Sequence, residues 1–134
     1  MKSMLFRNGI DVENQVDFCI NGLEGVNQIK EAYKIGVQYQ VIFTDFNMPL
    51  LDGIEATEKI REFLHEKGVV REMQPIVVGI TGHVLDQYMT AGTKAGMDEI
   101  YSKPLYASQM EEILERYNIN WYLKLFTTKN KYFL

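Results

Sequence analysis

The segment VIFTDFNMPLLDG, residues 41–53, begins as an apolar run and stops at a carboxylate. Val41 to Thr44 show no apolar–polar alternation, which is typical of a parallel strand covered on both faces. Asp45 follows at once, and Asp52-Gly53 stands where a residue that caps the next helix is expected. The segment therefore predicts a buried strand that holds Asp45 at its carboxyl end.

Strand and helix patterns alternate along the rest of the chain. Residues 76–81 form a second β-branched apolar run, residues 16–20 alternate like an edge strand, and residues 99–102 are a short fourth candidate. Apolar residues at helical spacing predict helices over 23–33, 54–64, 85–95 and 110–117. Strands that alternate with helices of this length predict an α/β fold with a parallel sheet.

Composition narrows the class of protein. The chain has 134 residues, enough for one domain, and its hydrophobic content of 46% and charged content of 24% are ordinary for a globular protein. A net charge of -4 gives no basic surface for nucleic acid, and no apolar run approaches the roughly 18 residues needed to span a bilayer. With one cysteine and no signal-peptide pattern at the start, we expect a cytoplasmic protein.

The segment 118–134 differs from the rest and is expected to be an aromatic and basic C-terminal tail outside a domain of residues 1–117. Its apolar residues lack a sustained period, so a continuation of the last helix or a disordered end is favoured over a partner-docking or membrane-surface segment. Its aromatic and basic residues are Trp121, Tyr122, Lys124, Phe126, Lys129, Lys131, Tyr132 and Phe133.

Three polar residues stand at the ends of predicted strands. Asp45, Thr81 and Lys103 each follow an apolar run, and the carboxyl ends of parallel strands meet at one rim of a sheet, where ligands bind. An ionised carboxylate, a hydroxyl donor and an ammonium group in one small volume suit transfer of an anionic group to the carboxylate. The sequence therefore predicts a site at this rim.

The segments VIFTDFNMPLLDG, VVGITGH and EIYSKP, in this order, resemble the three signature segments of response-regulator receiver domains. The resemblance runs over residues 10–117 and implies a flavodoxin-like, doubly wound fold. It implies that Asp45 accepts a phosphoryl group from a phosphohistidine on a histidine kinase or a histidine phosphotransfer protein, and that Thr81 and Lys103 hold this group. It further implies that Tyr101 is an aromatic switch and that the Lys103-Pro104 peptide bond is cis.

The first strand of the receiver-domain family has no counterpart in this sequence. Receiver domains begin with a strand that ends in an acidic pair, whereas here only Asp11 and Glu13, in a turn before residue 16, are acidic near the start. The missing strand is interior in the family's order 2-1-3-4-5. The sequence leaves three solutions open: the strand near Val16 pairs directly with the Val41 strand, the aromatic tail fills the gap, or the chain is an N-terminally truncated fragment.

The acidic pair of the family holds Mg²⁺, and its absence bears on function. With only Asp45 and the backbone carbonyl of Asn47 retained as ligands, Mg²⁺ binding is expected to be weak. We expect a phosphorelay receiver that is not itself an enzyme and that belongs to a parent such as a hybrid histidine kinase. Two alternatives are a non-phosphorylated pseudo-receiver that serves as an interaction module and an aspartyl-phosphate phosphatase. The second ranks low, because that class needs an acid where Asn47 stands.

Overall fold

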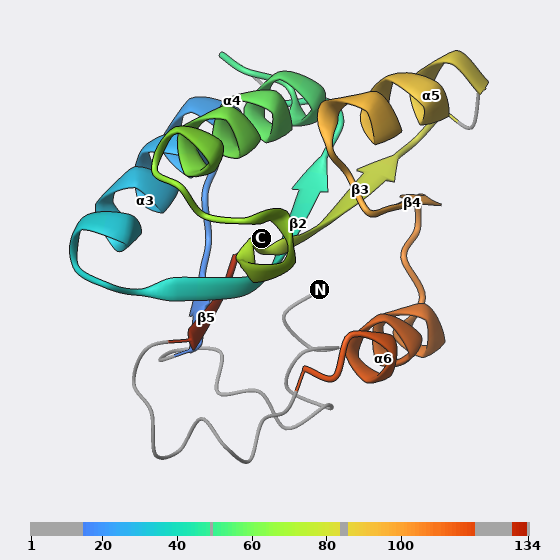
Figure 1. The fold of residues 1–134 in the computed structure, drawn as a ribbon. Helices are drawn as coiled ribbons and strands as arrows, with labels where there is room; N and C mark the ends of the chain where they lie inside the picture. Colours follow the sequence, from blue (N-terminus) through green and yellow to red (C-terminus); the bar gives the residue numbers. More distant parts are fainter. Residues whose placement is uncertain (1–14, 49, 84–85, 120–129, 134) are drawn as a thin grey trace.

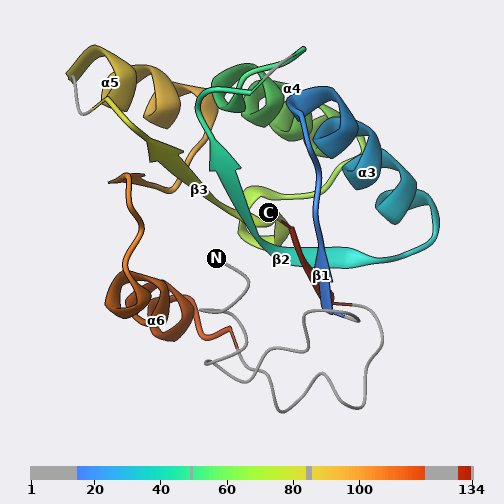
Figure 2. The same ribbon diagram turned by 180° about the vertical axis from the view of Figure 1, so that it is seen from behind.

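The structure is a computed structural model that describes residues 15–48, 50–83, 86–119 and 130–133. Strands and helices alternate through these ranges, with the strands gathered into one sheet (Figures 1 and 2). The described elements are β1 (Val16–Asp17), α3 (Gly22–Lys34), β2 (Gln38–Asp45), α4 (Gly53–Glu66), the 3-10 helix η1 (Arg71–Met73), β3 (Ile76–Thr81), α5 (Asp86–Ala95), β4 (Glu99–Ser102), α6 (Ala107–Arg116) and β5 (Asn130–Phe133).

The sheet has five strands in the order β1-β5-β2-β3-β4, and each described pairing is parallel. In the centre β2 runs beside β3, from Val41 opposite Ile76 to Asp45 opposite Ile80. The predicted α/β fold with a parallel, flavodoxin-like sheet is confirmed. The first predicted strand is shorter than expected, since β1 ends at Asp17.

The C-terminal segment supplies the strand that lies between β1 and β2. The four residues of β5 pair with β2 on one side, and two of them pair with β1 on the other. Of the three solutions left open by the sequence, the structure shows the one in which the tail fills the gap. The expectation of a continued helix or a disordered end is wrong for Asn130–Phe133, because α6 ends at Arg116 and backbone pairing stabilises the later segment as a strand.

Other expectations about the chain ends are not tested by the described residues. The rest of the tail, residues 120–129 and 134, lies outside the described ranges, and so do Asp11 and Glu13. The division of the chain at residue 117 and its N-terminal truncation stay predictions. No helix in the described ranges is long and apolar enough to cross a lipid bilayer.

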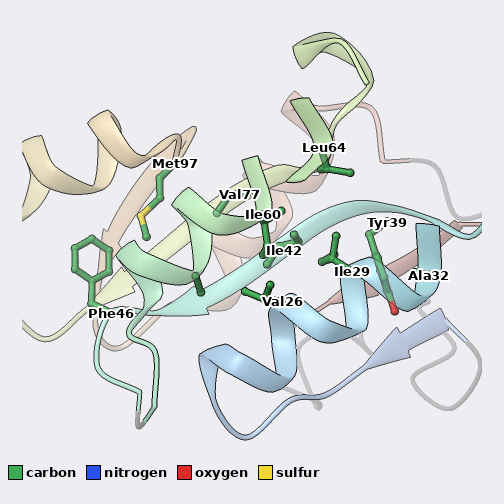
Figure 3. Close-up of a cluster of buried hydrophobic side chains, with 11 residues drawn as sticks. Val26, Ile29, Ala32, Tyr39, Ile42, Phe46, Ile60, Leu64, Val77 and Met97 are labelled. Carbon is green, nitrogen blue, oxygen red and sulfur yellow. The ribbon is translucent and has the colours of Figure 1, made fainter. Parts of the chain in front are cut away.

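Side chains on the two faces of the sheet build two apolar cores, with α6 on one side and α3 and α4 on the other (Figures 1 and 2). Val41 and Phe43 of β2 join the core under α6, whereas Ile42 between them joins the core under α3 and α4 (Figure 3). This alternation explains the unbroken apolar run, because both faces of the strand are covered. Burial on both sides also holds the end of β2 in place.

A buried arginine on α4 binds the end of α5 and the start of β3, at the rim of the sheet that lies opposite to Asp45. The Arg61 guanidinium on α4 donates to the carbonyl oxygens of Gly96 and Pro75 and pairs with Asp98 Oδ2 at 3.0 Å. The same carboxylate oxygen accepts the Val77 amide at 2.8 Å, so the carboxylate joins α4 to the start of β3. Burial, together with the nearby Arg71 charge, lowers the pKa of Arg61 to about 10, which leaves the group charged at neutral pH.

Candidate phosphoacceptor site

Asp45 lies at the end of β2, where its carboxylate is held from two sides. Oδ1 accepts a hydrogen bond from the Asn47 amide at 2.9 Å, and Oδ2 contacts Lys103 Nζ at 2.5 Å. The Asp45 side chain is 36% exposed, so it is held but reachable from solvent. The structure therefore brings together Asp45 and Lys103, two of the three residues predicted from strand ends.

Thr81 is the third of these residues, and its hydroxyl faces a different partner. It ends β3, is 1% exposed, and its Oγ1 both accepts from the His83 amide at 3.0 Å and lies 3.2 Å from the His83 carbonyl oxygen. Its backbone carbonyl accepts the Lys103 amide at 2.8 Å, which fixes the lysine beside β3. Thr81 thus lies at the predicted rim, with its hydroxyl bound to the following loop.

Tyr101 lies two residues before the lysine on β4 and is partly buried against the core under α6. Its hydroxyl donates to Glu99 Oε1 at 3.1 Å, and this same oxygen pairs with the guanidinium of Arg116 on α6. Burial, then the Glu99 carboxylate, raises the pKa of Tyr101. The sequence reasoning missed Glu99, although an acid two residues before a tyrosine in a strand lies on the same face and was a usable signal.

The Lys103-Pro104 peptide bond is cis, as the resemblance predicted. The loop after Asp45 also follows the expected pattern, since Asp52 caps α4 by accepting the Glu55 amide at 2.8 Å. Pro49 lies outside the described residues. The roles of Asp45, Thr81, Lys103 and Tyr101 in phosphoryl transfer stay predictions.

Gly53 packs directly against the backbone of Asp45, a contact that sequence reasoning missed. A Cβ atom at Gly53 would lie 2.3 Å from the Asp45 carbonyl oxygen, far inside van der Waals contact. The Gly53 amide donates to the Phe46 carbonyl at 3.1 Å, which draws the start of α4 onto the end of β2. A glycine is therefore needed here for close approach, and it sets the position of Asp45.

Gly53→Ala is expected to destabilise the domain by about 1–3 kcal/mol, because neither backbone segment can yield without disturbing the sheet or the helix. Gly82→Ala is the matched control, since a Cβ there meets no atom within 4 Å and the backbone has no positive φ. Its effect is expected within about 0.5 kcal/mol, or slightly stabilising. Urea denaturation of both variants measures the difference, and equal losses would contradict the proposed contact.

The described residues offer a poor set of ligands for a divalent cation. Asp45 supplies one carboxylate, and one of its oxygens is engaged by Lys103. In the described part of the chain, no group of three or more histidine, cysteine, aspartate or glutamate side chains is placed to hold a metal ion. Since Mg²⁺ prefers six oxygens in near-octahedral geometry, these residues do not fit a dedicated magnesium site.

Comparisons with curated proteins and solved structures point to two-component signalling. The chain is 34% identical over 117 residues to "Hybrid signal transduction histidine kinase G" of Dictyostelium discoideum, a match that covers 87% of this chain and 3% of that protein. It is 29% identical over 100 residues to "Two-component system protein A" of Emericella nidulans, with 75% of this chain and 13% of that protein covered. The chain thus spans a small part of these relatives.

Two solved structures share the fold of this chain, and their sequence identities to it are nearly equal. One is the receiver domain of a sensor histidine kinase from Pseudomonas aeruginosa PAO1, with magnesium coordinated in its active-site cleft; its TM-score is 0.67, its identity 25%, and the match covers 89% of this chain and 85% of that one. The other is the receiver domain of the Saccharomyces cerevisiae response regulator Ssk1, crystallised with the histidine phosphotransfer protein Ypd1. Its TM-score is 0.69, its identity 26%, and the match covers 88% of this chain and 78% of that one.

The family model of the response regulator receiver domain matches residues 2–115, which is most of the chain. This match includes the strand that ends at Asp45, the strand that ends at Thr81 and the loop with Lys103. By sequence and by fold, the chain belongs to the response regulator receiver domain family.

Proposed function

We propose that this receiver domain accepts a phosphoryl group on Asp45 from a phosphohistidine of a partner protein. The observation that carries the proposal is the partly exposed Asp45 carboxylate at the end of β2, with Lys103 Nζ 2.5 Å from one of its oxygens. An ionised carboxylate is already a nucleophile at neutral pH and needs no general base. The chain would thus act as a phosphoacceptor rather than as an enzyme in its own right.

In the proposed step, a carboxylate oxygen of Asp45 forms a bond to phosphorus while the bond from phosphorus to the partner's imidazole nitrogen breaks. The imidazole keeps the electron pair of that bond and takes up a proton from solvent. Lys103 stays beside the acceptor oxygen and neutralises charge on the phosphoryl oxygens. The Thr81 hydroxyl can donate to one of these oxygens only after leaving His83, and this movement is the event to which Tyr101 would respond.

The proposed partner is a histidine kinase or a histidine phosphotransfer protein, and the proposed setting is a phosphorelay in the cytoplasm. Support comes from the curated relatives, which include a hybrid histidine kinase, and from the related yeast receiver crystallised with its phosphotransfer protein. A net charge of -4 argues against nucleic acid as the target. Membership of a larger hybrid kinase is part of the same proposal.

Replacing Asp45 by asparagine is expected to abolish phosphorylation, because the amide has no nucleophilic carboxylate. Incubation with acetyl phosphate and Mg²⁺, followed by intact mass spectrometry, should show one phosphoryl adduct on the parent chain and none on D45N. The matched control is Asp52→Asn, which keeps a good helix cap and leaves the acceptor in place, so its adduct should persist.

The outcomes also separate the alternative functions. Absence of an adduct on the parent chain at every Mg²⁺ concentration would overturn the proposal and favour a pseudo-receiver. The pseudo-receiver alternative is supported by the fact that Asp45 is the one carboxylate retained as a Mg²⁺ ligand. Repeated turnover with release of free phosphate from unrelated substrates would favour a phosphatase. An adduct on both the parent chain and D45N would place the acceptor elsewhere.

Weak Mg²⁺ binding belongs to the same proposal, with Asp45 and the backbone carbonyl of Asn47 as the ligands from this chain. A titration followed by nuclear magnetic resonance is expected to shift the amides of these two residues only at about 1 mM Mg²⁺ or above, since one carboxylate gives little affinity. D45N should remove the shifts. Saturation at micromolar Mg²⁺ would show that further ligands complete the site.

A further inference from the structure

The residue after Asp45 is Phe46, which is buried although it stands just beyond the end of β2. It is 4% exposed, and its side chain belongs to the core under α3 and α4 (Figure 3). Ile42 of β2 belongs to the same core, whereas Phe43 belongs to the core under α6. The alternation of strand side chains between the two faces of the sheet therefore continues through Phe46. The Asp45 side chain consequently leaves the backbone on the face opposite to the Phe46 ring.

The Phe46 ring fills a slot between two glycines. A Cβ atom on Gly79, in β3, would lie 2.6 Å from Phe46 Cε1, and a Cβ atom on Gly92, in α5, would lie 2.9 Å from Phe46 Cζ. The Met97 side chain lies beside the ring in Figure 3, and its Sδ atom would lie 3.0 Å from the same Gly92 Cβ atom. A ring packed this closely between a strand and a helix has little freedom to shift.

The backbone of Phe46 is fixed as well. Its amide donates to the Ile80 carbonyl on β3 at 3.0 Å, and its carbonyl accepts the Gly53 amide at 3.1 Å. Because Phe46 follows Asp45 directly, the ring and these two hydrogen bonds set the direction in which the Asp45 side chain leaves the chain. That direction leads to Lys103, whose Nζ lies 2.5 Å from Asp45 Oδ2.

The slot also involves the strand that leads to Lys103. A Cβ atom on Gly92 would lie 2.7 Å from Ile100 Cδ1, so Ile100 of β4 packs at the same point of α5 as the Phe46 ring. Ile100 precedes Lys103 by three residues, and the Lys103 amide is held by the Thr81 carbonyl at 2.8 Å. The ring therefore shares one packing site with the strand that positions the lysine.

We propose that Phe46 is a positioning residue for phosphoryl transfer, which holds the Asp45 carboxylate beside Lys103 through the fit of its ring between Gly79 and Gly92. This inference rests on the proposed function of Asp45 as the phosphoacceptor. The reacting carboxylate oxygen has to approach phosphorus in line with the bond that breaks, and a misplacement of about 1 Å can slow such a step about a hundredfold. Phe46 acts through the backbone of Asp45 and not on the phosphoryl group.

Phe46→Ala is expected to slow phosphorylation of the full chain by acetyl phosphate about tenfold or more. In this reaction an Asp45 oxygen bonds to phosphorus while acetate leaves with the electron pair of the broken bond, so no partner protein has to dock. Intact mass spectrometry at a fixed Mg²⁺ concentration measures the rate, at a temperature at which circular dichroism shows that each variant is folded.

The matched control is Leu64→Ala, which truncates an apolar side chain of the same core near the other end of α4. Losses of stability from the two truncations fall in overlapping ranges. Since Leu64 lies far from Asp45 along the helix, L64A should change the phosphorylation rate by less than about twofold.

A compensating pair of variants tests the slot itself. Gly92→Ala places a methyl group against the Phe46 ring and should slow the reaction, because the ring has to move. Adding Phe46→Leu, whose smaller side chain leaves room for this methyl group, should recover most of the lost rate. F46L alone should slow the reaction less than F46A, and it takes the place of F46A if that variant does not fold.

The place of the carboxylate can also be measured without any reaction. The nuclear magnetic resonance signals of the Lys103 ε-methylene group report the adjacent Asp45 carboxylate, and D45N gives their shifts when its charge is lost. F46A is expected to move these signals toward the values of D45N. L64A should leave them at the values of the parent chain.

Three results would overturn the proposal. The first is a folded F46A variant with the parent rate and unmoved Lys103 signals. The second is equal slowing by F46A and L64A, which would show that loss of core packing in general slows the reaction. The third is a loss that persists in F46L/G92A. If the parent chain accepts no phosphoryl group, the proposed function fails, while the Lys103 signals still decide whether Phe46 positions Asp45.

Discussion

Deletion of residues 130–134 is expected to unfold the chain or to lower its melting temperature by more than about 10 °C. Four residues of β5 pair with β2 and two of them also pair with β1, so the deletion leaves two rows of backbone groups unpaired inside the sheet. Each buried unsatisfied group costs about 1–3 kcal/mol, against a total stability of about 5–15 kcal/mol for a domain. Circular dichroism during heating measures the loss.

A point variant separates the backbone of β5 from its side chains. Tyr132→Pro removes a backbone donor from a strand that is paired on both sides, where proline is not tolerated. Tyr132→Val changes the side chain but keeps the backbone donor and a residue type that is common in strands. We expect the proline variant to behave like the deletion and the valine variant to stay close to the parent. Similar behaviour of all three proteins would contradict the placement of β5.

Arg61→Met is expected to destabilise the domain by about 2–4 kcal/mol at neutral pH, since it removes the buried donor of the Pro75 carbonyl and one of the two arginines that bind the partly buried Asp98 carboxylate. The Arg61 side chain is 10% exposed and binds Asp98, Gly96 and Pro75. The loss reports the penalty for the stranded groups and not the net value of the ion pair. Denaturation in urea, with an unchanged m-value, is the measurement.

Arg71→Met is the matched control for this variant. Arg71 binds the same carboxylate and the same Gly96 carbonyl, yet its side chain is 48% exposed. An exposed ion pair contributes about 0–1 kcal/mol, because water replaces the lost partner. If the two variants lose the same free energy of unfolding, burial of Arg61 is not the reason for its contribution to stability.

Much of the site follows from local sequence. The strand that ends at Asp45 was predicted from an unbroken apolar run, and the helix after it from Asp52 as a cap; the structure has both. The proximity of Asp45 and Lys103 followed from parallel topology, which brings strand ends to one rim. These features depend on residues close together in the chain, or on one topological rule.

Other features could not be predicted, because they depend on partners far apart in sequence. Arg61 lies in a charged helix and resembles a surface residue until Asp98 is placed beside it, 37 positions away. The Thr81 hydroxyl could serve Asp45 or the loop backbone with equal ease, and the structure shows it bound to His83. The close approach of Gly53 to Asp45 likewise requires the packed positions of α4 and β2.

The order of the strands in the sheet separates most clearly what the sequence determines from what only the tertiary structure decides. Apolar pattern, strand-end carboxylate and helix cap follow from the sequence around residues 41–53, because each rests on short-range propensity and on burial. Only the tertiary structure decides that Asn130–Phe133 lies between β1 and β2. A short aromatic segment has no strand identity of its own and becomes β5 because two unpaired strand edges offer it hydrogen bonds that water cannot supply inside the sheet.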